Sequence, residues 1–172
     1  ANIWNASSNH RKEESRAERR RLFLFVCGHS VPAGSGSMRA VIQRVGHTKL
    51  SVEGRLIAEI ENGLVVYLGV GADDTAAQCA PMAKKIAQLR IFEDAGGKMN
   101  LSVQEVGGEV LLVSQFTLYG DCRHGNRPSF IAAARPEAAE PLYEEVIRLL
   151  SERGLRVKKG VFGADMKIEQ YN

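Results

Sequence analysis

The sequence has no apolar run approaching the roughly 18 residues of a membrane-spanning helix, so no membrane partner is expected. Cysteine is scarce: Cys27, Cys79 and Cys122 are scattered and odd in number, which excludes an even disulfide framework. No CxxC pair suggests zinc. This cysteine usage fits a reducing compartment, and we expect a cytoplasmic protein. With 172 residues, 44% of them hydrophobic, the chain is long enough for one soluble globular domain.

An excess of charge of one sign is also missing from most of the chain. The formal net charge is +3, but residues 1–37 hold six of the 23 Lys and Arg residues and only three of the 20 Asp and Glu residues. The remainder carries 17 of each sign. Total charge therefore gives no argument for nucleic-acid binding, and only local clusters could provide one.

Common catalytic and phosphate-binding motifs are absent as well. There is no GxSxG, and although Ser114, Asp121 and His124 are close in sequence, proximity alone does not create the geometry of a triad. Neither a P-loop nor GxGxxG occurs. Cys122 and His124 are near each other, but zinc needs about four ligands and no second cluster supplies the others. We therefore expect no metal and no cofactor.

Residues 1–37 differ in composition from the rest. They are polar and charged as far as Arg21, after which LFLFVC and the linker-like AGSGS precede Met38. The apolar stretch is shorter than that of a usual secretory signal. We interpret residues 1–37 as a disordered leader or extension outside the domain, and residues 38–172 as the domain.

From Met38 onward, the hydrophobic patterns predict an α+β fold, with a mainly antiparallel, barrel-like sheet and two helices. Glu53-Gly54 is typical of a hairpin turn. A first helix is expected from a cap near Thr75 to about residue 89, where Pro81 implies either a kink or a later start. A second helix should begin near Pro136 and end before Gly154.

The segment EVLLVSQFTL, residues 109–118, has the pattern of a strand buried on both faces, yet its end carries three polar side chains. On a strand, Gln115 and Thr117 would share one face, with Ser114 on the other. These groups either satisfy buried backbone groups or line a pocket. In such a pocket, backbone N–H groups and the Thr117 hydroxyl would polarise an ester carbonyl.

Several stretches, in order, resemble one family: MRAVIQRV, GLVVYLGV, LRIFED with GKMNLSV, VSQFTL, NRPSF and FGADM. The chain from Met38 onward is similar to the D-aminoacyl-tRNA deacylases, also called D-tyrosyl-tRNA deacylases. The resemblance implies a homodimeric, metal-independent enzyme that acts on the aminoacylated 3′ end of tRNA. It would hydrolyse the ester of D-aminoacyl-tRNA, and of glycyl-tRNA mischarged on tRNA-Ala, and so proofread chirality.

The resemblance also assigns roles to residues. It implies that Thr117, Gln115 and Ser114 form the catalytic strand end, with Thr117 nearest the ester as either nucleophile or positioning group; we favour positioning, since no base adjoins it in sequence. Arg44 matches an arginine that supports the family's chirality filter. The remaining substrate-binding positions are Phe116, Phe130, Gly163, Ala164, Asp165 and Met166.

Two local basic clusters stand out in the otherwise neutral domain. They are either solvated surface groups or contacts to tRNA phosphates, which need no sequence readout. The candidate phosphate contacts are Arg123, Arg127, Arg156, Lys158 and Lys159.

The end of the sequence departs from the family pattern. Asn172 matches the first residue of an Asn-x-Gly-Pro motif, so the domain is expected to lack the family's Gly-Pro and its last strand. A second class of function, a non-catalytic nucleic-acid-binding module with the same fold, remains an alternative. Hydrolysis of D-Tyr-tRNA would distinguish the two.

Overall fold

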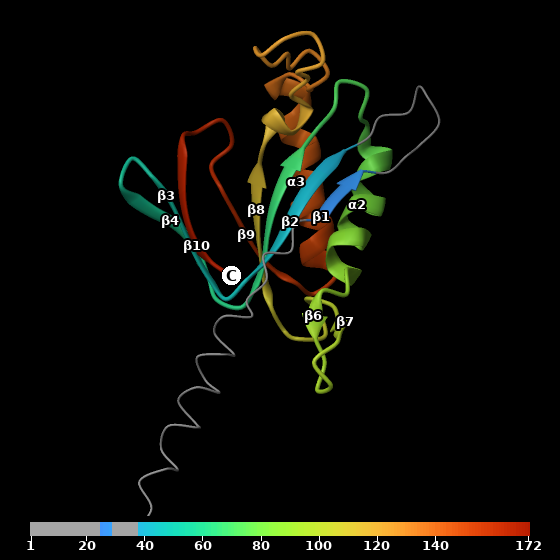
Figure 1. The fold of residues 1–172 in the computed structure, drawn as a ribbon, viewed down its shortest axis with the longest axis vertical. Helices are drawn as coiled ribbons and strands as arrows, with labels where there is room; N and C mark the ends of the chain where they lie inside the picture. Colours follow the sequence, from blue (N-terminus) through green and yellow to red (C-terminus); the bar gives the residue numbers. More distant parts are fainter. Residues whose placement is uncertain (1–24, 29–37) are drawn as a thin grey trace, which may run out of the picture.

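The computed structural model describes residues 25–28 and 38–172, and Figure 1 shows their arrangement. The elements form three layers: a small sheet, a larger central sheet, and two helices. Strand order in the central sheet is β1-β2-β5-β8-β9 and in the small sheet β10-β3-β4, while β6 and β7 form a separate pair. The central strands are β1 (Phe25–Gly28), β2 (Arg39–Val45), β5 (Gly63–Gly69), β8 (Glu109–Ser114) and β9 (Arg156–Lys159). The other strands are β3 (His47–Val52), β4 (Arg55–Ile60), β6 (Phe92–Glu93), β7 (Met99–Leu101) and β10 (Met166–Tyr171).

The α+β class and the two helices are confirmed, but the sheet differs from the expectation in two ways. Each sheet is open, so the barrel-like part of the expectation is not confirmed. Pairing in the central sheet is mixed, because β5–β8 and β8–β9 are parallel. Hairpin signals could not reveal this, since parallel partners are joined by long connections and not by tight turns.

The central strands β5 and β8 are buried on both faces, and alternation along them separates two cores. Leu64 and Val66 belong to the core under the helices, whereas Val65 belongs to the core under the small sheet. In β8, Val110 and Leu112 face the helices while Leu111 and Val113 face the small sheet. The double burial expected for β8 is therefore confirmed.

Helix α2 (Ala76–Gln88) begins at a capping box, in which the Thr75 hydroxyl accepts from the backbone and Gln78 bonds back to the cap. It runs through Pro81 as one element, so a later start is wrong. Helix α3 (Pro136–Glu152) has proline in its first turn, as expected. Gly154, at φ 81°, follows its end, a backbone conformation that favours glycine.

The hairpin between β3 and β4 turns at Glu53 and Gly54, with φ values of 50° and 77°, which confirms the turn expected there. Four residues of the stretch expected to lie outside the domain, Phe25–Gly28, form β1 and pair with β2 at the edge of the central sheet. The rest of residues 1–37 lies outside the described residues. Neither α2 nor α3 is long and apolar enough to cross a membrane, and the same holds throughout residues 25–28 and 38–172.

Candidate active site

The polar end of β8 is where the strand stops. The last ladder-like bond joins the Gln115 N–H to the Leu68 carbonyl at 2.8 Å, after which the chain turns into a short 3₁₀ helix, η1 (Phe116–Tyr119). The expectation of a strand continuing to Leu118 is therefore wrong. Hydrophobic periodicity cannot distinguish a strand from a single 3₁₀ turn over so few residues.

Gln115 and Thr117 nevertheless meet. The side-chain amide of Gln115 donates a hydrogen bond to the Thr117 hydroxyl oxygen. The expected neighbourhood of these two side chains is confirmed, but a turn brings them together and not the alternation of a strand. Both groups lie at the surface end of β8, beyond the buried part of the strand.

Two groups from other elements hold η1 against the central sheet. Arg39, at the start of β2, donates to the Leu118 carbonyl at 2.9 Å, and its guanidinium lies 4.4 Å from the centre of the Tyr119 ring. The Tyr119 hydroxyl contacts the Asp74 carboxylate at 3.4 Å, and the Gly71 N–H donates to the same oxygen at 2.6 Å. Burial is the main cause that raises the pKa of Asp74, since it disfavours the charged carboxylate.

Gly69, the last residue of β5, allows η1 to pack closely against the end of this strand. A Cβ atom at this position would stand 3.0 Å from the Gln115 carbonyl oxygen and 3.1 Å from the Tyr119 ring. The backbone carbonyl cannot yield as a flexible side chain could, so a larger residue here would displace the turn that carries Thr117.

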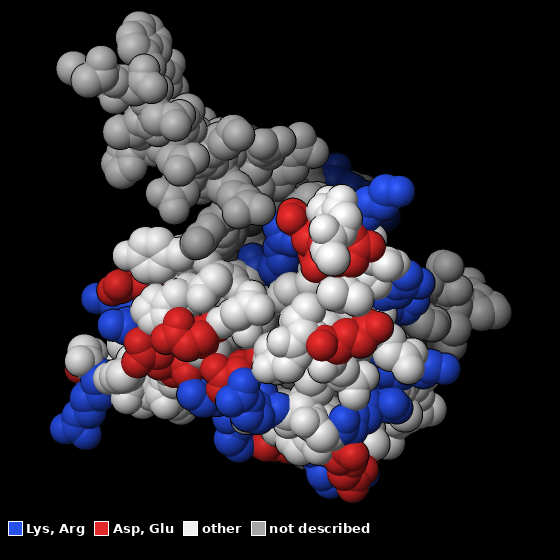
Figure 2. All heavy atoms as spheres, turned by 90° about the horizontal axis from the view of Figure 1, so that it is seen from below, with Lys and Arg blue, Asp and Glu red and all other residues white. Residues whose placement is uncertain are grey.

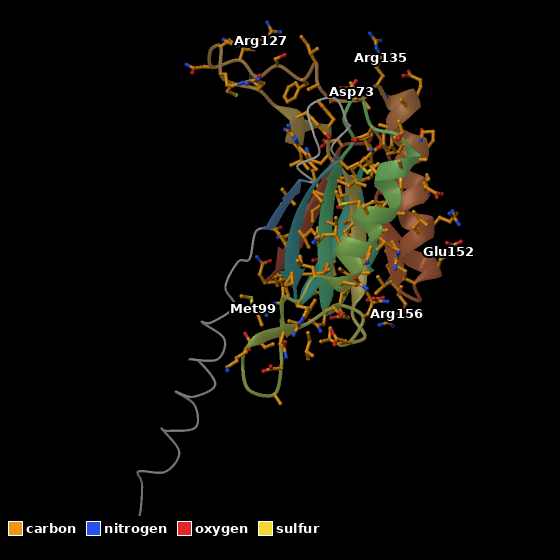
Figure 3. All side chains as sticks on the ribbon, turned by 90° about the vertical axis from the view of Figure 1, so that its right-hand side faces the viewer. Asp73, Met99, Arg127, Arg135, Glu152 and Arg156 are labelled. Atoms are coloured by element: carbon orange, nitrogen blue, oxygen red, sulfur yellow. The ribbon has the colours of Figure 1, made fainter. Side chains whose placement is uncertain are left out.

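A pocket of about 630 Å³ opens beside this strand end, between the N-terminal half of α3, η1 and the loop before β10. Figure 3 shows this end of the molecule near the Arg127 and Arg135 labels. Most of the substrate-site residues named from the resemblance line it together: Ser114, Gln115, Phe116, Phe130, Gly163, Ala164, Asp165 and Met166.

Two aromatic rings stand at the pocket mouth. Phe116 and Phe130 meet edge to face, with ring centres 5.2 Å apart and planes at 75°. Phe116 remains 57% exposed, which is unusual for a large apolar side chain and leaves its face open to a ligand. Gly163 also lines the pocket and adopts φ 74°, a conformation that favours glycine, and the three residues after it line the pocket as well.

Among the three expected catalytic residues, Thr117 is the one that does not line the pocket. It is exposed and does not line the pocket wall, although its partner Gln115 does. Its hydroxyl oxygen is already an acceptor, so the hydroxyl proton is the group that can be offered to a ligand.

Helix α3 also contributes to the pocket, which was not expected from the sequence. Arg135, Pro136 and Ala139, from its first turn, line the pocket, and so does Tyr143, whose buried hydroxyl donates to the Leu112 carbonyl at 2.8 Å. Pro136 marked the beginning of this helix in the sequence, but nothing there indicated that the helix begins at the pocket.

Comparison with known proteins agrees with this geometry. The family model described as D-Tyr-tRNA(Tyr) deacylase matches residues 41–172. The chain belongs to this family. A D-aminoacyl-tRNA deacylase of Anaeromyxobacter dehalogenans is 58% identical over 135 residues, covering 78% of this chain and 91% of that protein. One of Thermotoga petrophila is 54% identical with the same coverage.

Two solved structures share the fold of this deacylase family member. The c-Myc DNA Unwinding Element Binding Protein superposes with a TM-score of 0.72 at 39% identity, covering 77% of this chain and 91% of the other. A probable eukaryotic D-amino acid tRNA deacylase superposes with a TM-score of 0.68 at 18% identity, over 77% and 92% of the two chains. At that identity, the second likeness shows the fold alone.

The basic residues expected to contact tRNA are not gathered at this pocket. Figure 3 shows Arg127 at the pocket end and Arg156 at the opposite end of the molecule. Arg123 lies 2.6 Å from Asp121 and holds the pKa of that carboxyl at about 2. On β9, Arg156 and Lys158 lie 4.0 and 3.8 Å from Glu109, and the third cation of this strand, Lys159, lies 2.6 Å from Glu144.

Arg44 is also remote from the pocket within one chain. Strand register pairs it with Leu64, while Leu68 pairs with Ser114, so about 13 Å of strand separates the two levels. It is mostly buried, donates to the Ile91 carbonyl at 3.1 Å and lies 3.8 Å from Glu93.

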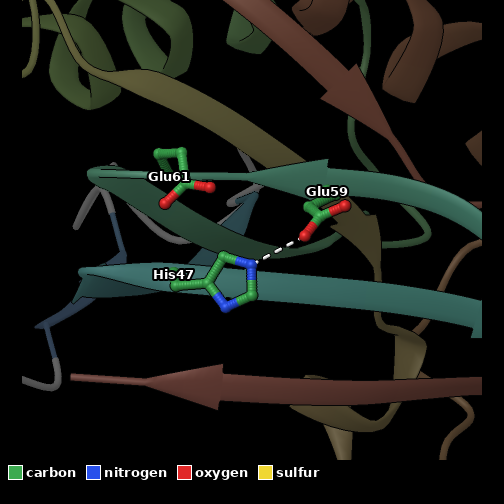
Figure 4. Close-up of side chains that lie close together, drawn as sticks. All are labelled: His47, Glu59 and Glu61. Atoms are coloured by element: carbon green, nitrogen blue, oxygen red, sulfur yellow. Dashed lines mark hydrogen bonds and ion pairs between the residues drawn. The ribbon is translucent and has the colours of Figure 1, made fainter.

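A separate group of potential metal ligands lies on the small sheet, where His47, Glu59 and Glu61 come close together (Figure 4). His47 contacts Glu59 at 2.8 Å, and Lys49 lies 3.5 Å from the same carboxylate oxygen. The His47 hydrogen bond is the largest cause that lowers the pKa of Glu59. Because Lys49 supplies a positive charge to Glu59 and His47 already shares a hydrogen bond with it, we interpret the group as a cross-strand polar cluster and not as a second reaction centre.

Proposed function

We propose that this chain hydrolyses the ester bond of D-aminoacyl-tRNA in the strand-end pocket, releasing tRNA and the free D-amino acid. The observation that supports this most is the convergence of Ser114, Gln115 and Phe116 with residues 163–166 around one cavity. A volume of about 630 Å³ suits a ligand the size of an aminoacylated nucleoside. Family membership supplies the reaction class.

The groups that would stabilise the transition state lie at the beginning of η1. Within the described part of the chain, the N–H groups of Phe116 and Thr117 donate to no backbone or side-chain acceptor. Free N–H donors beside a pocket can bind the oxygen that becomes negatively charged when an ester carbonyl is attacked. Arg135 and the positive end of α3 would add to this field.

Thr117 would act as a hydrogen-bond donor and not as a nucleophile. A nucleophilic hydroxyl needs a neighbouring base to take its proton, and the partner here is a donating amide. That amide reduces the basicity of the Thr117 oxygen and directs its proton outward. Water would then attack the carbonyl carbon, and the bond to the ribose oxygen would break, with the ribose 2′-OH able to assist.

The aromatic mouth gives the terminal adenosine a place to bind. Exposed aromatic faces such as that of Phe116 stack on bases, and Phe130 fixes the ring at the rim. Arg135 and Arg127 lie at this end and could contact the nearest phosphates. Contacts from Arg123, Arg156, Lys158 and Lys159 remain a prediction, and their acidic partners reduce the charge they can offer.

Chirality control, in this proposal, needs a second copy of the chain. Arg44 is too far from its own pocket to act there, so its support of a filter would be exerted across a homodimer. A filter that admits hydrogen but no L side chain would also admit glycine, which accounts for glycyl-tRNA as a further substrate. Since aminoacyl-tRNA is used in translation, the cytoplasm is the expected compartment.

The test is single-turnover deacylation of D-Tyr-tRNA, L-Tyr-tRNA and Gly-tRNA-Ala, with and without EDTA. We expect rapid release from the D-aminoacyl and glycyl substrates, slow release from the L-aminoacyl substrate, and no effect of the chelator. Equal rates on the D and L substrates would contradict chiral selection. Tight tRNA binding without any hydrolysis would favour the non-catalytic module instead, as the name of the c-Myc DNA Unwinding Element Binding Protein suggests for that relative.

A further inference from the structure

A second hollow lies on the helix side of the molecule, at the end remote from the pocket. It is a groove of about 720 Å³ lined by residues of the C-terminal half of α2 and by Arg153, just after α3. We call it the basic groove; its cations are Lys84, Lys85, Arg90 and Arg153. Among the described residues, none that lines it is acidic. A smaller hollow of about 330 Å³ shares Arg153 and continues to Arg156.

The positive charge of the basic groove is not neutralised by ion pairs within the described part of the chain. Within residues 38–172, no ion pair joins Lys84, Lys85 or Arg153 to a carboxylate. This distinguishes them from the β9 cations, which lie beside Glu109 and Glu144. Arg90 is different, because it bonds to Asn100 and its charge helps to lower the pKa of Glu105.

Interactions with helix ends do not account for all of the cations that line the basic groove. Lys85 lies in the last turn of α2, where the helix dipole favours a cation. Lys84 precedes that turn, and Arg153 follows the end of α3, whose own dipole favours a cation there, so no one dipole explains the whole cluster. Figure 2 views the molecule from the end opposite the pocket and shows basic side chains along the α2 side, with acidic ones nearer the middle.

We propose that the basic groove binds the sugar-phosphate backbone of tRNA whose 3′ end occupies the pocket. The inference rests on the proposed function, which fixes one end of an RNA at the N-terminal half of α3. Arg153 follows the other end of this helix of 17 residues, about 25 Å away. An RNA stem that runs from the pocket along α3 would cross a surface of this length and reach the basic groove. Unpaired lysines at such a distance suit phosphates, which act as point-charge partners without sequence readout.

The test compares two double variants that each remove two charges. Lys84→Gln with Lys85→Gln changes the groove, and Arg55→Gln with Lys167→Gln changes exposed cations on the small sheet, on the other side of the central sheet. Each is assayed with D-Tyr-tRNA and with the trinucleotide CCA carrying a D-tyrosyl ester, and for binding of uncharged tRNA over a range of salt concentrations. Melting temperatures check that both variants fold.

We expect the groove variant to raise KM for D-Tyr-tRNA by at least about tenfold at low salt, with kcat unchanged. The slope of log K against log salt for uncharged tRNA should become shallower by about 1 to 2. Hydrolysis of the trinucleotide should not change, and the small-sheet variant should behave as the parent. Unchanged tRNA binding by the groove variant, or an equal loss in the small-sheet variant, would overturn the inference. Failure of the parent chain on both esters would overturn the proposed function, and the binding assay would still test the groove.

Discussion

The side-chain amide of Gln115 donates to the hydroxyl oxygen of Thr117 across the first turn of η1. This bond joins a residue of the pocket wall to one that stands just outside it. It fixes both the position of the Thr117 hydroxyl and the direction in which its proton is available. Since Arg39 and Tyr119 anchor the same turn to the central sheet, the site is built on a rigid support and not on a free loop.

Replacing Thr117 with alanine removes the donor but leaves the turn. Single-turnover deacylation of D-Tyr-tRNA should slow by about 10²-fold, the usual effect of losing one donor to a developing oxyanion. Binding of tRNA should stay within a factor of about two, because the lost contact acts mainly in the transition state. Thr117→Ser, which keeps the hydroxyl, should retain most of the rate. An unchanged rate in the alanine variant would exclude Thr117 from the chemistry.

Gln115→Glu tests the direction of the hydrogen bond with an isosteric change. A carboxylate accepts and cannot donate, so it would turn the Thr117 proton away from the substrate and place a negative charge near the developing oxyanion. We expect a larger loss of kcat than in Gln115→Ala, which only removes the partner. If Gln115→Glu were instead faster than the parent, the carboxylate would be serving as a base, and Thr117 would be a nucleophile after all.

Asp74 makes the stability of the folded chain depend on pH. Its pKa is raised in the folded chain, mainly by burial, above the ordinary value of 3.8. Protonation therefore favours the folded state: this contribution grows as pH falls through the raised pKa and is complete below the unfolded value. The free energy of unfolding of the parent, minus that of Asp74→Asn, should rise between about pH 7 and pH 4. Chemical denaturation at several pH values measures it, and a constant difference would show that the carboxyl is not perturbed.

Removing residues 1–37 should leave deacylation intact, because every described residue that lines the pocket lies between Leu68 and Ile168. The chain beginning at Met38 would lose only the pairing of β1 with β2 among the described contacts of that stretch. We expect a modest fall in melting temperature and an unchanged rate constant. A deletion that abolished activity while the protein remained folded would show that the stretch reaches the pocket.

Local patterns in the sequence were sufficient for the helices and for the buried strands. The Thr75 cap and the proline at the beginning of α3 act between near neighbours, and the double burial of β8 is visible in the sequence as a continuous apolar run. Parallel pairing of β8 with β5 and β9 could not be foreseen, because it depends on contacts between distant segments.

Some features of the site could likewise be predicted from the sequence, and others could not. Motif matching placed the strand end and the segment around Gly163 in one pocket, and the structure brings them together. It could not show that Arg123 and Lys159 would find carboxylates, since ion pairs depend on which surfaces fold next to each other. Nor could it place Arg135, whose position depends on how α3 packs against the central sheet.

The most direct test of the strand-end pocket is to fill it with a larger side chain. Ala133 lines the pocket, whereas its neighbour Ala132 is exposed and does not. Ala133→Trp should reduce the single-turnover rate on D-Tyr-tRNA by at least about 10²-fold, because the indole occupies space required by the ester and its adenosine. Ala132→Trp, an equal change one residue away, should retain the parent rate, and both should melt near the parent temperature. If the filled pocket still cleaved D-Tyr-tRNA at the parent rate, the reaction would take place elsewhere on the molecule, and the proposed site would be wrong.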